Sequence, residues 1–175
     1  MHDLIAICSP AGIVHLRPER NDDRDFRYLL FCNSRPPEWD HVQLDPTQRE
    51  QLMRHQFQAQ TMTYAARFPR ARFDIIELAG ERIGRIVVNR PGDVLHVVDQ
   101  AIIPRLRNQG IGTAIMDSLM RDAANLKLPI RLKVADANDR SLRLYLRLGF
   151  VPIRTVPAYI ELEWRGLQAV GASEP

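Results

Sequence analysis

Three β-rich runs in the middle of the chain constrain the fold more than any other feature of the sequence. They occupy residues 73–78, 83–88 and 94–103, and only the short segments 79–81 (AGE) and 90–93 (RPGD) separate them. Glycine, proline and aspartate are typical of hairpin turns, because each favours a backbone conformation that a tight reversal needs. The spacing therefore predicts two successive hairpins, which together form an antiparallel meander.

Helical patterns lie on both sides of this meander. Apolar residues follow helical spacing over residues 21–31, and Pro36 and Pro37 interrupt the pattern. Thr47 and Glu50 form an S/T-x-x-E capping box, which predicts a second helix that runs to about residue 68. The other expected elements are a strand at 13–16, an amphipathic helix that opens at Ile111, a strand at 130–134, a helix at 139–148 and a strand pair at 151–156 and 159–164.

The order of these elements predicts one mixed α/β domain. The chain has 175 residues, which is the usual length of a single domain. No internal repeat, low-complexity block or linker composition divides it. We expect one domain over residues 1–175, with a core at about 13–165 and a loose tail over residues 171–175.

The composition is typical of a globular protein. Hydrophobic residues make up 45% and charged residues 26% of the chain, and no apolar run approaches the roughly 18 residues of a membrane span. Cys8 and Cys32 are lone thiols without a CxxC or Cys/His cluster, so the sequence predicts neither a disulfide scaffold nor a metal site. The apolar stretch 4–8 is shorter than the apolar region of a secretory signal, which is about 7 to 15 residues long. We therefore expect a cytoplasmic protein without metal or membrane contact.

The basic residues are almost all arginine. The formal net charge is +3, and Lys127 and Lys133 are the only lysines among 24 basic residues. Arginine suits phosphate, because its planar fork donates two parallel hydrogen bonds to an oxyanion. High-GC codon usage explains the same composition, so only the positions of individual arginines can indicate a ligand.

A glycine-containing segment, residues 107–113 (RNQGIGT), lies between the long apolar strand and the following helix. The first amides of a helix have no intrahelical acceptors and carry the positive end of the helix dipole, so glycines there let a diphosphate approach. The segment lacks the Gly-Lys-Ser/Thr of a P-loop and the third glycine of a Rossmann fingerprint. It therefore predicts a diphosphate site of another kind.

A second segment, residues 138–150 (NDRSLRLYLRLGF), makes the first one more specific. Together the two resemble the GNAT family of acyl-CoA-dependent N-acyltransferases. The family's pyrophosphate loop, Q/R-x-x-G-x-G/A, matches residues 107–112, and Ser141 replaces the alanine of its later motif, N-x-x-A-x-x-x-Y-x-x-x-G-F. The residues that match this later motif are Asn138, Tyr145, Gly149 and Phe150. The order of elements extends the resemblance over nearly the whole chain.

The resemblance implies a GNAT fold, which is a mixed central sheet of about six or seven strands flanked by about four helices. The N-terminal strands form the antiparallel meander, and the fourth and fifth strands, 94–103 and 130–134, splay apart. The pantetheine arm of acetyl-CoA would lie between them, with its thioester end near the backbone of Ile102.

The resemblance also implies which residues hold acetyl-CoA. Backbone amides of the glycine segment would take the diphosphate, and Arg107 would add a charge-assisted hydrogen bond. Asn138 would bind the pantetheine or simply cap the last helix, since asparagine is a favoured N-cap residue. The expected contacts are Ile102, Arg107, Gln109, Gly110, Ile111, Gly112, Thr113 and Asn138.

In this family an amine attacks the thioester directly. Tyr145 is the candidate acid for the leaving thiolate, and its alternative role is packing with a hydrogen bond to sulfur. His96 is the candidate base, because it lies five residues before Ala101 in the splayed strand, where several branches of the family carry a glutamate or histidine. The ordinary histidine pKa of about 6.5 suits this role, and the alternative role of His96 is that of an ordinary half-buried strand residue. Side chains alternate along a strand, so Asp99 faces the other side unless a bulge intervenes.

Two features concern the acceptor. Branches that resemble ribosomal-protein N-terminal acetyltransferases place a glutamate base where this chain has Lys133, and a cation cannot replace that carboxylate. The connection 33–45 contains Trp39 between Glu38 and Asp40, which either clasps an amine or belongs to a surface loop. Arg140, Arg143 and Arg147 share one helix face, which is solvated or lets one of them reach a ribose phosphate.

We therefore expect an acyl-CoA-dependent N-acyltransferase that transfers acetyl to a primary amine of a small molecule or peptide. Two alternatives stay open: a toxin-like enzyme that acetylates charged tRNA, and a non-catalytic module that binds acyl-CoA. The small positive charge permits nucleic acid without requiring it. A homodimer is an open alternative to a monomer.

Overall fold

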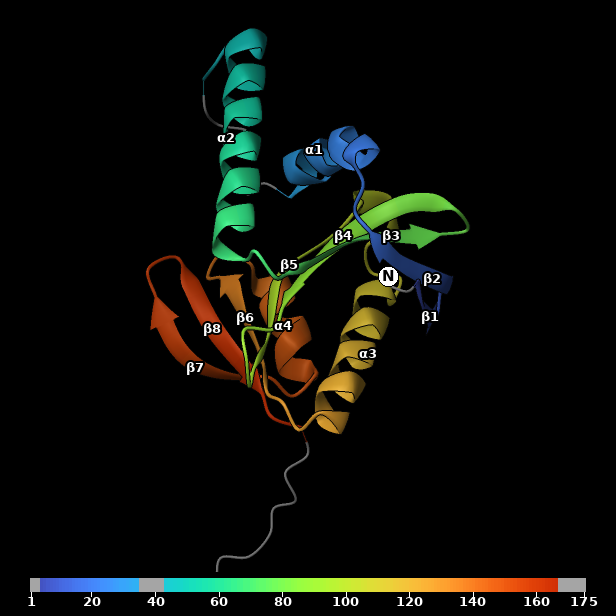
Figure 1. The fold of residues 1–175 in the computed structure, drawn as a ribbon. Helices are drawn as coiled ribbons and strands as arrows, with labels where there is room; N and C mark the ends of the chain where they lie inside the picture. Colours follow the sequence, from blue (N-terminus) through green and yellow to red (C-terminus); the bar gives the residue numbers. More distant parts are fainter. Residues whose placement is uncertain (1–3, 35–42, 167–175) are drawn as a thin grey trace, which may run out of the picture.

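A central eight-stranded mixed sheet organises the protein (Figure 1). A computed structural model describes residues 4–34 and 43–166. The strand order is β1-β2-β3-β4-β5-β6-β8-β7, and only the β5–β6 pair is parallel. The strands are β1 (Ile5–Ser9), β2 (Gly12–Pro18), β3 (Arg72–Leu78), β4 (Glu81–Asn89), β5 (Leu95–Ile102), β6 (Ile130–Ala135), β7 (Val151–Val156) and β8 (Tyr159–Trp164). The expected α/β fold with an antiparallel meander is confirmed.

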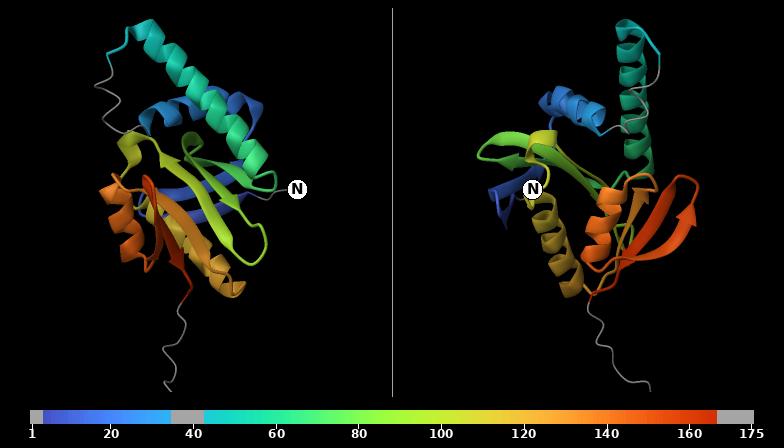
Figure 2. Two further views of the ribbon diagram at one scale, coloured as in Figure 1. Left: turned by 90° about the vertical axis from the view of Figure 1, so that its left-hand side faces the viewer. Right: turned by 180° about the vertical axis from the view of Figure 1, so that it is seen from behind.

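Four α-helices cover the two faces of the sheet. They are α1 (Arg24–Asn33), α2 (Pro46–Arg67), α3 (Ile111–Asn125) and α4 (Asp139–Arg147). Helices α1 and α2 lie on one face, and α3 and α4 lie on the other (Figure 2). Among the residues that the structure describes, single turns of 3-10 helix at Asn21–Asp23 and Pro104–Leu106 connect strands to helices.

The sheet has more strands than the six or seven that we expected, because the short apolar stretch at the start of the chain forms β1. This strand pairs antiparallel with β2 over five positions, from Ile5 opposite Leu16 to Ser9 opposite Gly12. Its Ile7 side chain is 5% exposed and packs in the main core. The five-residue stretch gave no sequence signal of its own, since its pairing depends on the following strand.

The N-cap residue of α2 lies two residues before the expected one. Asp45 is the N-cap residue, and its carboxylate accepts hydrogen bonds from the amides of Thr47 at 2.8 Å and Gln48 at 3.0 Å. Pro46 occupies the first helical position, where its fixed φ favours the helix and its missing N–H costs nothing. Glu50 instead accepts a hydrogen bond from the Tyr28 hydroxyl at 2.9 Å, so the capping-box interpretation of Thr47 and Glu50 is wrong.

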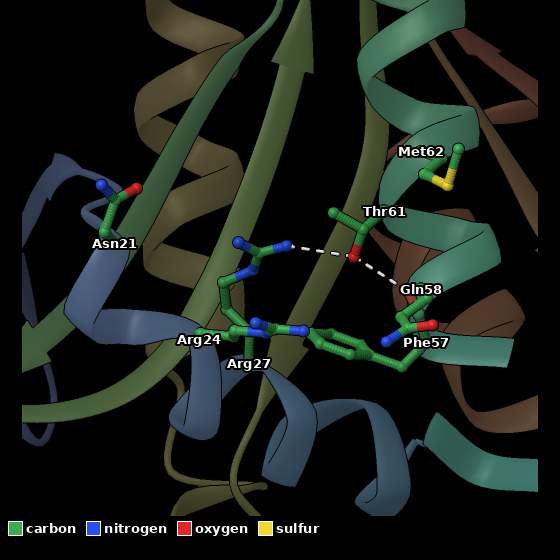
Figure 3. Close-up of a pocket in the computed structure, with 7 residues that line it drawn as sticks. All are labelled: Asn21, Arg24, Arg27, Phe57, Gln58, Thr61 and Met62. Atoms are coloured by element: carbon green, nitrogen blue, oxygen red, sulfur yellow. Dashed lines mark hydrogen bonds between the residues drawn. The ribbon is translucent and has the colours of Figure 1, made fainter. Parts of the chain in front are cut away.

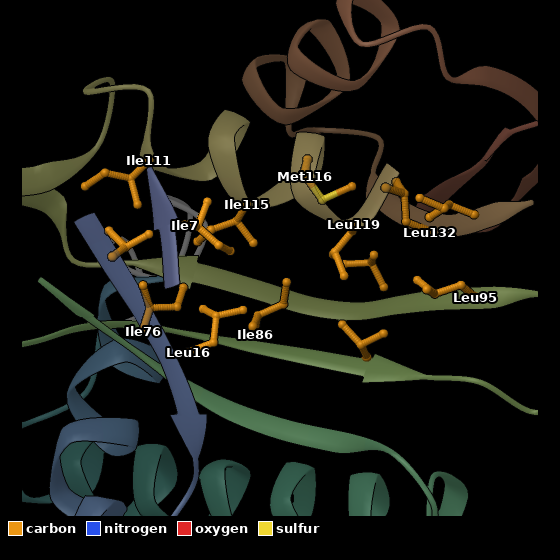
Figure 4. Close-up of a cluster of buried hydrophobic side chains, with 14 of the residues drawn as sticks. Ile7, Leu16, Ile76, Ile86, Leu95, Ile111, Ile115, Met116, Leu119 and Leu132 are labelled. Carbon is orange, nitrogen blue, oxygen red and sulfur yellow. The ribbon is translucent and has the colours of Figure 1, made fainter. Parts of the chain in front are cut away.

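The core lies between α3 and the sheet (Figure 4). Ile111, Ile115, Met116 and Leu119 form the apolar stripe of α3, and all are less than 9% exposed. They pack against strand residues such as Ile86. This packing fixes the N-terminus of α3 next to the end of β5, where the glycine segment lies.

Strands β5 and β6 separate over the second half of their length. They pair only at Leu95–Ile130, His96–Arg131 and Val97–Leu132, although β5 continues to Ile102. The expected splay is therefore confirmed, and it leaves backbone groups of β5 without a strand partner on that side.

Some expectations fall on parts of the chain that the structure does not describe. The Pro36-Pro37 break, the Trp39 loop and the tail at 171–175 lie outside the described residues. Within 4–34 and 43–166, no helix combines the length and apolarity that crossing a bilayer demands.

Candidate active site

A cleft of about 1010 Å³ opens where β5 and β6 diverge. Its walls come from the end of β5, the glycine segment, the start of α3, the end of β6, and α4, while α2 and β8 close one end. Pockets of this size hold drug-sized or cofactor-sized ligands. The cleft therefore unites the two sequence segments that we singled out, residues 107–113 and 138–150.

The glycine segment presents free backbone amides to this cleft. Gly110 is the N-cap residue of α3, and the first intrahelical bond runs from the Ala114 amide to the Gly110 carbonyl at 2.9 Å. The amides before Ala114 have no intrahelical acceptor, and the helix dipole makes this end positive. Residues 110–113 all line the cleft, so their amides can bind an anion there.

Only glycine fits at position 110. Its φ is +76°, and an added Cβ would lie 2.8 Å from Cγ of Pro10 in the β1–β2 turn. At Gly112, by contrast, an added Cβ would meet Gln100 and Ile102 at an ordinary 3.6 Å. The first glycine is therefore required by the backbone and by packing, whereas the second tolerates alanine.

Cationic side chains dominate the cleft. Asp99 is the one carboxylate among the described residues that line it, and the cations are Arg107, Lys133, Arg140, Arg143 and Arg147. Burial and the neighbouring Arg140 lower the pKa of Arg107. An anionic ligand would relieve this repulsion, so the charge balance suits a molecule that carries several phosphates.

Arg107 also has a structural role. Its Nε donates to the Ile102 carbonyl at 2.8 Å, and Nη2 donates to the carbonyl of Asn33, the last residue of α1, at 2.9 Å. These bonds use two of the five N–H donors of the guanidinium. The side chain thus joins α1 to the end of β5 while it lines the cleft.

Two other expected ligand contacts have local hydrogen-bond partners. The Asn138 side chain caps α4 by accepting from the Ser141 amide at 3.1 Å, and it also lines the cleft. The Gln109 side chain donates to the Arg105 carbonyl at 3.0 Å and is not among the lining residues.

The backbone of Ile102 faces the gap between β5 and β6. The Ile103 amide donates to the Ile83 carbonyl on β4 at 2.9 Å. Backbone groups of successive strand residues point to opposite sides, so those of Ile102 point away from β4. Its N–H can therefore donate to a group in the cleft.

Tyr145 lines the cleft close to Asp99. Its ring packs edge-on against Phe150, with 5.5 Å between ring centroids. Burial and the nearby Asp99 carboxylate raise the pKa of Tyr145 to about 12, so the hydroxyl keeps its proton at neutral pH. Tyr64 of α2 also lines the cleft, and burial, the Asp99 carboxylate and Tyr159 raise its pKa to about 12.

A β-bulge places His96 and Asp99 on the same face of β5. Val88 pairs with Val97 and Val87 pairs with Asp99, so Val98 is the extra residue. Both side chains then face the α1–α2 side. Asp99 lines the cleft, whereas His96 lies where β5 and β6 still pair and is not among the lining residues.

The two candidate bases have different electrostatic surroundings. Burial, with added repulsion from Arg131 and Lys133, lowers the pKa of His96. Burial raises the pKa of Asp99, while Arg85 of β4 opposes this change. A raised carboxyl pKa makes Asp99 a stronger base than an ordinary aspartate.

Sequence reasoning did not find two residues that lie close to Asp99, one that lines the cleft and one behind it. Tyr64 lies in a helix whose periodicity marks only its apolar face, and Arg85 lies in a strand of the meander. Neither belongs to a motif, and both reach Asp99 only through the tertiary fold.

Comparisons with known proteins agree with this arrangement. The model of the acetyltransferase (GNAT) family matches residues 28–150, which is more than half of the chain. A comparison with curated proteins found no match.

Several solved structures share the fold. The PaiA N-acetyltransferase of Thermoplasma acidophilum, in complex with coenzyme A, has a TM-score of 0.66 and 15% identity, covering 87% of this chain and 98% of that one. Ard1 of Thermoplasma volcanium has a TM-score of 0.62 and 21% identity, covering 89% and 99%. RimJ of Mycobacterium smegmatis, in complex with CoA-disulfide, has a TM-score of 0.62 and 18% identity, covering 97% and 90%.

Identities this low establish a common fold and nothing finer. The match to the family model extends over α2, the splayed strands, the glycine segment and α4, which together build the cleft. The chain therefore belongs to the acetyltransferase (GNAT) family, whose general chemistry is acyl transfer.

Proposed function

We propose that the protein transfers an acetyl group from acetyl-CoA to a primary amine of a small molecule or peptide. One observation carries this proposal: a single cleft is lined both by the amides and cations of the glycine segment and α4 and by Asp99 and Tyr145. The amides and cations suit a diphosphate, and Asp99 and Tyr145 supply a base and an acid.

The cofactor part of the proposal rests on the glycine segment and the splay. The amides of residues 110–113 would bind the diphosphate, with Arg107 and Arg140 beside them. The pantetheine would extend between β5 and β6, where strand pairing stops after Val97. Structures of relatives in complex with coenzyme A or CoA-disulfide support a donor of this class.

In the proposed reaction the amine nitrogen attacks the thioester carbonyl carbon. The Ile102 N–H is the candidate donor to the oxyanion that forms, and such a donor is worth roughly 3 to 4 kcal/mol in comparable acyl-transfer sites. The amine passes one proton to Asp99. The C–S bond then breaks, the Tyr145 hydroxyl passes its proton to the leaving thiolate, and the proton held by Asp99 returns to Tyr145 through solvent, which leaves an amide, free CoA and both side chains in their starting forms.

The cleft favours Asp99 over His96 as the base. Asp99 lines the cleft at the end where Tyr145 lies, and its carboxylate is close enough to raise the pKa of Tyr145. His96 is the alternative, since a neutral imidazole is also a competent base and a bound water could connect it to the amine.

The test of this proposal is a screen of free-thiol release from acetyl-CoA over alkyl amines, amino acids, polyamines and peptides. We expect at least one amine to give turnover, with an N-acetyl product identified by mass spectrometry. Tight CoA binding without turnover across the panel would instead favour a non-catalytic acyl-CoA-binding module.

The base is assigned by the pH dependence of kcat/KM. Asp99→Asn should remove the acidic limb of the profile, while His96→Ala should leave it in place. The opposite pattern would assign the proton transfer to His96. If both variants keep the acidic limb, water is the base.

A further inference from the structure

A line of alternating charges extends from Asp99 to the seam between α1 and α2. Arg85 Nη1 lies 3.7 Å from Asp99 Oδ2, and Arg85 Nε donates to Glu19 Oε2 at 2.9 Å. The other Glu19 oxygen, Oε1, lies 2.5 Å from Nη1 of Arg27 on α1. The four side chains come from three separate parts of the chain, and all lie on the α1–α2 face of the sheet.

Both oxygens of the Glu19 carboxylate are held by arginines. One oxygen contacts Arg85 and the other contacts Arg27, so rotation of the carboxylate would break one of the two contacts. The Glu19 amide also donates to the Phe73 carbonyl at 2.9 Å, which ties its backbone to β3. Glu19 is therefore a rigid acceptor for the Arg85 guanidinium.

Arg27 is itself held between the two helices (Figure 3). Its Nη2 donates to the Thr61 hydroxyl of α2 at 3.2 Å, and Thr61 donates onward to the Phe57 carbonyl at 2.8 Å. The guanidinium also stacks over the Phe57 ring, 5.5 Å from its centroid. The line of charges thus begins on elements that pack on the sheet and ends at the cleft.

Arg85 has little freedom to adopt another position. Its side chain is 8% exposed, and its guanidinium lies 5.4 Å from the centroid of the Phe73 ring. Planar guanidinium groups suit two carboxylates at once, because their donors point in fixed directions. Of the two carboxylates here, Glu19 takes the hydrogen bond and Asp99 takes the longer charge contact.

We propose that Arg85, anchored by Glu19 and Arg27, is a positioning residue that holds the Asp99 carboxylate in the cleft near Tyr145 and favours its anionic form. This inference rests on the proposed role of Asp99 as the base.

Among the groups that face Asp99, Arg85 is the main source of positive charge. Tyr64 from α2 and Tyr145 from α4 are both neutral at physiological pH, and burial and the Asp99 carboxylate raise their pKa values further, to about 12. Lys133 from β6 lines the same cleft and is exposed. Burial raises the pKa of Asp99, and Arg85 is the first opposing influence, followed by the Gln100 backbone amide.

His96 lies on the same face of β5, and a change of its charge would also act on Asp99. It is surrounded by Arg131, Lys133 and Glu161, and burial lowers its pKa. The lowered pKa of His96 disfavours its charged form, whereas Arg85 is permanently charged.

The test is the pH dependence of kcat/KM for Arg85→Gln, Arg85→Lys and the wild-type protein. Removing an opposite charge at this distance shifts a carboxyl pKa upward by about one unit or more, so the acidic limb for Arg85→Gln should move up by about one pH unit. The acidic limb for Arg85→Lys should lie between those of the wild type and Arg85→Gln, because lysine keeps the charge but cannot bridge two carboxylates. KM for acetyl-CoA should not change, since Arg85 is not among the residues that line the cleft.

Arg17 provides a matched control. It is an arginine of the same sheet face, is 8% exposed, and bonds Asp23 and Glu77 instead of Asp99. Arg17→Gln should destabilise the fold without moving the acidic limb. If Arg17→Gln does not fold, the more exposed Arg82 replaces it, since Arg82 also contacts Asp23.

Titration of the Asp99 carboxyl by ¹³C NMR, without any substrate, tests the effect of Arg85 on Asp99 separately from the role of Asp99 as the base. An Asp99 resonance whose midpoint rises in Arg85→Gln but not in the control supports the inference. An unchanged midpoint overturns it. If the midpoint rises while Asp99→Asn keeps the acidic limb of kcat/KM, Arg85 still acts on Asp99 but the proposed base is wrong.

Discussion

Alanine at each of the two glycines of the diphosphate loop should give opposite results. At Gly110 an alanine would have to adopt a left-handed backbone with φ near +76°, which costs about 1 to 2 kcal/mol. Its Cβ would also lie 2.8 Å from Cγ of Pro10, and overpacking of this kind costs about 1 to 3 kcal/mol. We expect the free energy of unfolding of Gly110→Ala to fall by roughly 2 to 5 kcal/mol.

The same substitution should weaken CoA binding. Relief of the contact with Pro10 moves the backbone at the start of α3, where the unpaired amides lie. Loss of one charge-assisted hydrogen bond to phosphate costs about 1.5 to 3 kcal/mol, which is roughly a 10-fold to 150-fold increase in Kd.

Gly112→Ala is the matched control. Its Cβ would have contacts of 3.6 Å, its φ is not positive, and alanine favours a helix over glycine by about 1 kcal/mol at an interior position. We expect its stability to equal or slightly exceed that of the wild type, and its Kd for CoA to stay within about threefold. Urea unfolding measures the change in stability. Calorimetric titration with CoA, at a temperature where both variants are folded, measures the change in Kd. Equal Kd values for the two variants would refute the assignment of the loop.

Three further predictions concern other parts of the account. Tyr145→Phe should lower kcat while Kd for CoA stays unchanged, because only the proton donor is lost; unchanged kcat would reduce Tyr145 to a packing role. Arg140→Gln should weaken CoA binding and reduce its dependence on salt, since one cation of the cleft is removed, and a titration series in NaCl measures this. The bonds from Arg17 lower the pKa of Asp23 from 3.8 to about 2, so the anion stabilises the fold above the unfolded pKa and this stability is lost as pH falls through 2. That linkage is worth about 2 kcal/mol between pH 5 and pH 2, and Asp23→Asn should lack it in acid-unfolding curves.

The parts of the fold that the sequence predicts are those with local signals. The hairpin turns at 79–81 and 90–93 and the glycine before Ile111 act through neighbouring residues, and all three lie where expected. The splay of β5 and β6 followed from resemblance, since no local pattern encodes it.

The parts that sequence reasoning missed depend on distant partners. Strand β1 forms because β2 offers an edge, and the bulge at Val98 appears only in the register between β4 and β5. That bulge decides that His96 and Asp99 share a face. The contact between Asp99 and Arg85 likewise joins two strands, and Arg85 has no motif to mark it.

The direct test of the central claim is acetyl transfer from acetyl-CoA to amines, followed by mass spectrometry of the product, with wild-type protein and Asp99→Asn in parallel. We expect an N-acetyl product and one equivalent of free CoA for the wild type, and a loss of kcat/KM at neutral pH for Asp99→Asn with CoA affinity retained. Equal rates for the two proteins with the same amine would contradict the proposed role of Asp99 as the base.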